Sequence, residues 1–224
     1  EECPSKIKTI GLFFKDMNNL AIEGNGSLLL FHDKMITLCF DNCSNIVVRN
    51  LRQDYVRPTM SEMRIVKQND DTVEAVIHHQ SKYKVENGTL KWIDNNWETV
   101  HSFAARIDTV EHTMYYSTWK PFEKSRAELL ADGLVRFTGV QNWEGSAGNV
   151  LTVRDIIRDQ VGGVILKSKN IKFENISFHY LHGLGIISQL SENLTFDRVS
   201  FAPPNGSGRY MAASADMLHF SSCK

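Results

Sequence analysis

The sequence repeats one short phrase at a fixed distance. Residues 168–178 read SKNIKFENISF and return as SENLTFDRVSF at residues 191–201, so Asn170 and Asn193 lie 23 positions apart. After the Asn, apolar and polar residues alternate in both copies, which is the pattern of a β-strand. A fixed period that contains such alternation is typical of a β-solenoid, in which each repeat forms one rung stacked on the next. The repeat therefore predicts an all-β protein, a right-handed parallel β-helix.

Two weaker copies of the phrase lie nearer the N-terminus, at residues 17–24 and 43–51. Asn belongs at the corners of a solenoid because its side chain tolerates a left-handed backbone. We therefore expect Asn45, Asn170 and Asn193 to occupy equivalent corners of successive rungs. The apolar residues of the two long copies should then stack in register: Ile171 on Leu194, Phe173 on Phe196, and Ile176 on Val199.

The middle of the chain lacks this repeat. Two dipeptides there, Asn87-Gly88 and Asp132-Gly133, are flanked by strand-like segments and are strong signals for tight hairpins. The sequence thus predicts three parts: β-helix rungs over residues 1–58, an inserted small antiparallel β-barrel or sandwich over residues 59–148, and β-helix rungs resumed over residues 149–224, with the solenoid continuing beyond the chain end.

Composition narrows the classes of partner and cofactor. The net charge of −1 gives no electrostatic argument for nucleic acid, and no run approaches the roughly 18 apolar residues of a membrane span. Cys3, Cys39, Cys43 and Cys223 form no Cys-x-x-Cys motif and have no second pair of ligands at a suitable spacing. We therefore expect no metal ion and no cofactor.

The best candidate for chemistry lies near the C-terminus. In the segment 214–220, Asp216 falls where a corner turns into a strand, and Leu218 and Phe220 share one phase of that strand. If these two side chains point inward, His219 points outward, beside the carboxyl group. A carboxyl group next to a His is suited to general acid catalysis. The alternative is that Asp216 only caps the turn and His219 is an ordinary surface residue.

A second group of polar residues lies one rung earlier. His179, His182 and Gln189 occur with two glycines in one corner, and Arg209 follows in a loop. Histidine and glutamine can hydrogen-bond a sugar, and arginine can hold a hydroxyl-rich or anionic ligand. These residues either form the wall of a polar groove or belong to a plain corner, and Arg209 is either a ligand clamp or a solvated cation.

Three motifs together resemble glycoside hydrolase family 110, the α-1,3-galactosidases that remove terminal α-linked galactose, including that of the blood group B determinant. They are GNGSLLLFH at residues 24–32, HGLGIISQ at 182–189 and ADMLHFS at 215–221. The resemblance implies a pectin-lyase-like β-helix that acts as an inverting exoglycosidase on galactose-terminated oligosaccharides or polysaccharides. It also implies that no metal is needed and that the protein is a bacterial one, periplasmic or secreted.

The resemblance assigns the two catalytic roles. Asp216 matches the general acid of the family, whose base is an Asp-Asp pair about one rung further on and is therefore expected after Lys224. Inverting hydrolysis needs the two carboxyl roles about 6.5–9.5 Å apart. The residues that we expect to bind the sugar, from their own chemistry, are His219, His182, Arg209, His179 and Gln189.

Two other readings of the residues stay open. One is another β-helix enzyme that acts on polysaccharides, either polygalacturonase-like or a lyase, although the repeated strands carry no acidic cluster of the kind that binds Ca²⁺ in lyases. The other is a non-catalytic, carbohydrate-binding β-helix. Linkage preference, branching of the substrate and oligomeric state are not set by the sequence.

Overall fold

The computed structural model describes residues 7–100, 103–116, 120–155 and 160–224, and every regular element within these ranges is a β-strand. The all-β class predicted from the sequence is confirmed. The chain divides into two compact units: the first holds Glu1–Pro58, Ile157–Ser207 and Met211–Lys224, and the second holds Thr59–Ile156 and Gly208–Tyr210. No helix in the described ranges is long and apolar enough to cross a membrane.

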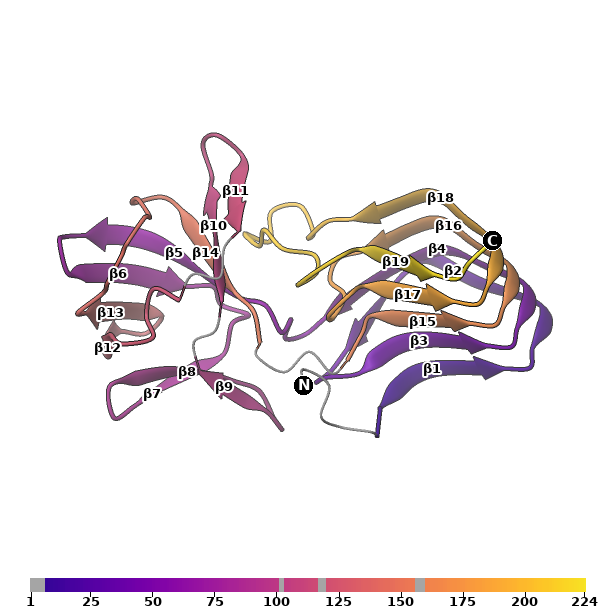
Figure 1. Ribbon diagram of the computed structural model, residues 1–224, viewed down its shortest axis with the longest axis horizontal. Helices are drawn as coiled ribbons and strands as arrows, with labels where there is room; N and C mark the ends of the chain where they lie inside the picture. Colours follow the sequence, from indigo (N-terminus) through magenta and orange to yellow (C-terminus); the bar gives the residue numbers. More distant parts are fainter. Residues whose placement is uncertain (1–6, 101–102, 117–119, 156–159) are drawn as a thin grey trace. The chain divides into compact units, whose positions relative to one another are not determined.

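The first unit consists of two sheets in which all neighbouring strands are parallel, and the chain passes alternately from one sheet to the other (Figure 1). The five-stranded sheet has the order β1 (Ile10–Lys15), β3 (Ile36–Asp41), β15 (Gly163–Leu166), β17 (Ile186–Gln189), β19 (Leu218–Ser221). The four-stranded sheet has the order β18 (Glu192–Phe201), β16 (Lys169–Phe178), β4 (Ser44–Tyr55), β2 (Asn18–Phe31).

The strands of the four-stranded sheet are held in the register that the repeat predicts. In β16 and β18, Ile171 pairs with Leu194 and Phe173 pairs with Phe196, and the pair Ile176 and Val199 follows. The predicted stacking of these residues is therefore confirmed. Because the side-chain period of a strand is two, this register keeps each apolar residue above its counterpart on the interior face.

Each of these four strands has an Asn in its second position, and these residues form what we call the asparagine ladder. Asn19, Asn45, Asn170 and Asn193 all have a left-handed backbone, with φ of 57, 55, 55 and 55°. The side-chain amides of the last three donate to the amide oxygen of the preceding Asn: Asn45 to Asn19 over 3.1 Å, Asn170 to Asn45 over 2.8 Å, and Asn193 to Asn170 over 3.0 Å. The expected equivalence of the three corners at Asn45, Asn170 and Asn193 is confirmed.

The interior of the first unit is a column of aromatic and aliphatic side chains between the two sheets. Phe173 is at its centre and is fully buried: its ring stacks on that of Phe196, with centroids 5.2 Å apart, and meets Phe40 edge-on at 6.3 Å. Phe196 is only partly buried, because β18 is an edge strand with a neighbour on one side.

The second unit is antiparallel throughout its described strands. Its seven-stranded sheet has the order β11 (Thr113–Tyr116), β10 (Ala104–Asp108), β14 (Val150–Val153), β5 (Ser61–Gln68), β6 (Thr72–Ile77), β13 (Leu134–Thr138), β12 (Arg126–Ala131). A three-stranded sheet has the order β7 (Tyr83–Glu86), β8 (Thr89–Ile93), β9 (Glu98–Val100).

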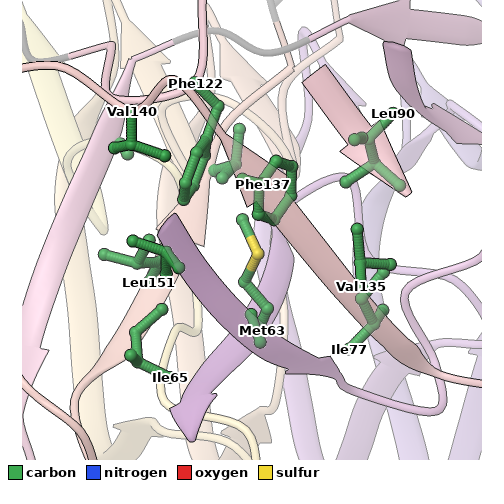
Figure 2. Packing of buried hydrophobic residues seen from close by; sticks show 14 of the residues in the cluster. Met63, Ile65, Ile77, Leu90, Phe122, Val135, Phe137, Val140 and Leu151 are labelled. Carbon is green, nitrogen blue, oxygen red and sulfur yellow. The ribbon is translucent and has the colours of Figure 1, made fainter. Parts of the chain in front are cut away.

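Hairpin turns and a separate hydrophobic core define this second unit. Asn87 and Gly88, between β7 and β8, both have positive φ, as a two-residue hairpin turn requires, and Gly133 does so between β12 and β13. Figure 2 shows the core, where the ring of Phe122 stacks on that of Phe137 with centroids 3.9 Å apart. The second unit therefore has a core of its own, distinct from the column in the first unit.

We predict that the asparagine ladder contributes measurably to stability. Asn170→Ala removes one donated and one accepted hydrogen bond and places alanine in a left-handed backbone, so the free energy of unfolding should fall by about 2 kcal/mol. Asn170→Gly loses the same hydrogen bonds without the backbone strain and should cost less. Urea unfolding of both variants measures the difference, and an equal loss in the two would contradict the role of the left-handed corner.

We also predict that the aromatic column is most sensitive at its centre. Phe173→Ala removes a fully buried ring and should lower the free energy of unfolding by about 3–5 kcal/mol. Phe196→Ala should cost less, because that ring is partly exposed. Lys169→Ala is the control, since it breaks only an exposed ion pair with Glu192 and should stay within about 0.5 kcal/mol. Equal thermal shifts for the Phe173 and Lys169 variants would rule out the proposed packing.

Candidate active site

Asp216 and His219 come together where the chain enters the last strand of the five-stranded sheet. Asp216 lies two residues before β19, and its Oδ2 is 3.2 Å from Nδ1 of His219. Both side chains are open to solvent, the carboxyl group at 62% and the imidazole at 46% of their full exposure. A carboxyl group and a titratable ring in hydrogen-bond contact on an open surface can exchange protons with a bound ligand.

The pairing of β19 with β17 determines which side chains face outward. Leu218 pairs with Ile186 and packs against the buried column, so the next residue, His219, lies on the outer face beside Ile187. The sequence analysis expected Phe220 to be interior as well. Its ring does approach that of Phe196, with centroids 6.0 Å apart, but the residue is 49% exposed, because β19 is an edge strand and no further rung covers it in the described chain.

Gln189 shares this outer face with His219. It lies two positions after Ile187 in β17 and pairs with Ser221, so it has the same phase as the imidazole on the neighbouring strand. Val164 of β15 pairs with Ile187, so it lies on the same outer face. Sequence reasoning missed Val164 and Ile187 as part of the site, although their shared phase with His219 could have identified them.

His182, by contrast, lies in the interior of the first unit rather than on an open groove wall. The residue is 2% exposed, and its ring contacts those of Tyr55 at 4.0 Å and Tyr180 at 5.5 Å. Its Nε2 is 3.3 Å from the carbonyl oxygen of Asp33. Burial lowers the pKa of His182 to about 3, and this hydrogen bond only partly opposes the effect. The imidazole is therefore neutral at ordinary pH.

The remaining two candidates lie away from Asp216 along the chain. His179 follows β16, is partly buried, and has its Nδ1 2.9 Å from the carbonyl oxygen of Ala202. Arg209 is grouped with the second unit and is 9% exposed, so it is not the solvated loop cation considered above. The structure thus brings Asp216 and His219 together, and Gln189 shares the outer face with His219, whereas His182 is interior.

The cysteines in the described ranges are separate from this site. Cys39 and Cys43 are buried, and burial raises the pKa of Cys39 to about 11. Cys223 is partly buried, with its Sγ 3.4 Å from the carbonyl oxygen of Ser188, and Cys3 lies outside the described residues. Within those residues, no group of three or more His, Cys, Asp or Glu side chains is arranged to hold a metal ion.

Comparison with known proteins finds relatives whose names state one activity. Residues 61–151 match the family described as GLAA-B beta-barrel domain I. The whole chain is 44% identical over 225 residues to a protein of Bacteroides fragilis named alpha-1,3-galactosidase A. Proteins of Bacteroides thetaiotaomicron named alpha-1,3-galactosidase A and B are 33% and 27% identical over 99% and 96% of the chain.

These similarities confirm the resemblance to the α-1,3-galactosidases of glycoside hydrolase family 110. They extend over nearly the full chain and include both the repeated rungs and the antiparallel part. The chain itself covers 37%, 39% and 36% of these three relatives, so it spans less than two fifths of their length.

We predict that His182 makes the protein sensitive to acid. Its folded pKa of about 3 lies below the unfolded value of 6.5, so between these values the unfolded chain binds more protons and stability falls as the pH is lowered. The loss should approach about 1.4 kcal/mol per pH unit. His182→Gln should flatten the dependence of the unfolding free energy on pH, and His179→Gln is the matched control. If wild type and His182→Gln lose stability with equal slopes between about pH 4 and about pH 6, the prediction fails.

Proposed function

We propose that the protein containing this chain is a glycoside hydrolase that removes terminal α-1,3-linked galactose from oligosaccharides or glycans, acting by an inverting acid/base mechanism. The observation that carries the proposal is the exposed Asp216–His219 pair in a chain whose relatives, over its whole length, are named alpha-1,3-galactosidase. The substrate is then a galactose-terminated oligosaccharide or polysaccharide, and the enzyme uses no cofactor.

In this mechanism Asp216 is the general acid. It donates its proton to the glycosidic oxygen as the bond to galactose breaks, and a second carboxylate on the opposite side of the sugar takes a proton from the attacking water. That base is expected after Lys224, on a rung that follows β19. The exposure of Asp216 supports the assignment, because a proton donor has to reach a substrate bound outside the sheet.

The outer face of the five-stranded sheet supplies the surroundings of the sugar. His219 and Gln189 offer hydrogen-bonding groups on that face, and Val164 and Ile187 form an apolar row beside them. A galactose ring has one apolar face and a rim of hydroxyl groups, so a surface with both characters suits it. His219 also holds the carboxyl group of Asp216 in place through its Nδ1.

The other three candidate residues have less direct roles in this proposal. His182 acts from the interior, because its ring packs on Tyr55 and its Nε2 contacts the carbonyl group of Asp33. His179 and Arg209 are proposed contacts for parts of the substrate beyond the terminal galactose.

The fold and location proposed for the protein follow the same resemblance. We infer that the two parallel sheets are part of a right-handed parallel β-helix, with rungs over residues 1–58 and 149–224 and an antiparallel β-barrel inserted at 59–148. The alternation of the chain between two parallel sheets supports this inference. A periplasmic or secreted bacterial enzyme would meet such glycans outside the cell.

The test is Asp216→Asn in the full-length protein, with Asp70→Asn, an exposed turn residue of the second unit, as the matched control. Turnover of an α-1,3-linked galactosyl disaccharide should fall by about 10²–10⁴-fold in the Asp216 variant, because its leaving group needs protonation. An activated aryl α-galactoside should suffer less. Proton NMR of the first product should show β-galactose, as inversion demands.

Four results would overturn the proposal. Wild-type turnover of the disaccharide by Asp216→Asn would remove Asp216 as the acid, and α-galactose as the first product would exclude inversion. Binding of galactosyl glycans without any hydrolysis by the full-length protein would favour the non-catalytic carbohydrate-binding alternative, and cleavage of uronate polymers would favour the lyase or polygalacturonase-like one.

A further inference from the structure

We propose that Gly185 is a positioning residue for Asp216, one that sets where the carboxyl group lies by allowing the backbone of the next rung to approach more closely than any side chain permits. The inference rests on the proposed function, in which Asp216 is the general acid. Gly185 lies directly before β17, and the segment Asp216–Met217 passes over it directly before β19.

The approach of the two segments leaves no room for a Cβ atom at position 185. A Cβ built on Gly185 would lie 2.3 Å from the carbonyl oxygen of Met217 and 2.9 Å from that of Asp216. Both of these are backbone atoms and cannot swing away as the end of a flexible side chain can. Gly185 also has a φ of +62°, a left-handed backbone that glycine adopts without steric cost.

Gly185 itself is fixed from two sides. Its N–H donates to the carbonyl oxygen of His182 over 3.1 Å, and its own carbonyl oxygen accepts from the N–H of Gly163 in the preceding rung over 2.9 Å. The Met217 carbonyl group in turn accepts from the N–H of Ile186 over 3.0 Å. Since Gly185 is held by the rung below, an added methyl group has to displace the segment that carries Asp216.

That displacement is large enough to affect the rate of catalysis. Restoring an ordinary contact of 3.4 Å at an atom that now lies 2.3 Å away requires a shift of about 1 Å. A misplacement of about 1 Å in a reacting group can cost about 10²-fold in rate. The rate should fall because proton donation to the leaving group is slower, since Asp216 is the group that moves.

The experiment compares Gly185→Ala with wild type in the full-length protein, using an α-1,3-linked galactosyl disaccharide and a nitrophenyl α-galactoside. We expect kcat/KM for the disaccharide to fall by about 10²-fold and that for the aryl substrate, whose leaving group needs little protonation, to fall much less. In an Asp216→Asn background, Gly185→Ala should cause almost no further loss, because the two changes remove the same contribution.

Two other glycines serve as controls for backbone strain. Gly183 lies in the same corner with a φ of +52°, but a Cβ there would meet the carbonyl oxygen of Gln160 in the preceding rung at 2.5 Å instead of the Asp216 segment. Gly206 has a φ of +74° and no heavy atom within 4 Å of a built Cβ. Gly183→Ala and Gly206→Ala should therefore lower stability without shifting the ratio of the two substrates.

Gly185→Asn is the second variant, should the alanine protein fail to fold. Asn tolerates a left-handed backbone better than alanine, as the asparagine ladder shows, yet it carries a Cβ, so it should give the same selective loss. Unchanged disaccharide turnover in a folded Gly185 variant, with Asp216→Asn inactive, overturns this inference and leaves the proposed function standing. An equal loss of kcat/KM on the two substrates also overturns this inference. Wild-type activity of Asp216→Asn on the disaccharide overturns both this inference and the proposed function.

Discussion

The structure of the first unit depends on one repeated constraint, the left-handed corner at which each strand of the four-stranded sheet begins. The four Asn residues of the asparagine ladder adopt this conformation with nearly equal φ and bond to one another from strand to strand. A corner of fixed geometry sets where the next strand starts. Because a shift of one residue would turn every apolar side chain outward, the register of the whole aromatic column follows from that starting point.

The same register reaches the candidate site through the five-stranded sheet. Once β15, β17 and β19 are aligned, Leu218 has to face the interior and His219 has to face out, next to Ile187. Asp216 then lies within hydrogen-bond distance of the imidazole because only Met217 separates it from the start of β19. The geometry of the pair is thus a consequence of rung stacking, and substitutions that loosen the stacking should also loosen the site.

How far the sequence could predict this structure depends on whether a residue belongs to the repeat or lies outside it. Within the strands, alternation and the 23-residue repeat predicted the pairs Ile171–Leu194 and Phe173–Phe196, which the register confirms. The corners at Asn45, Asn170 and Asn193 follow the same repeat, but the connections that hold His182 and Arg209 do not. His182 was expected on a groove wall and is buried. Arg209 was considered either as a ligand clamp or as a solvated loop cation, and it is also buried. Their burial depends on how segments distant in sequence fold over them, and the local sequence pattern holds no information on that folding.

The two kinds of left-handed corner in the first unit solve different physical problems. At the corners of the four-stranded sheet, neighbouring rungs leave space for side chains, so Asn can adopt the strained backbone and use its amide to bind the next rung. At Gly185 the next rung approaches within 2.3 Å of where a Cβ would be, so a side chain is excluded. The Asn corners add hydrogen bonds between rungs and so favour stability. The Gly185 corner has no side chain to form such a bond, but it allows the backbone of the next rung to approach closely. That this approach occurs under Asp216 is the physical reason to connect the glycine corner with the position of the acid.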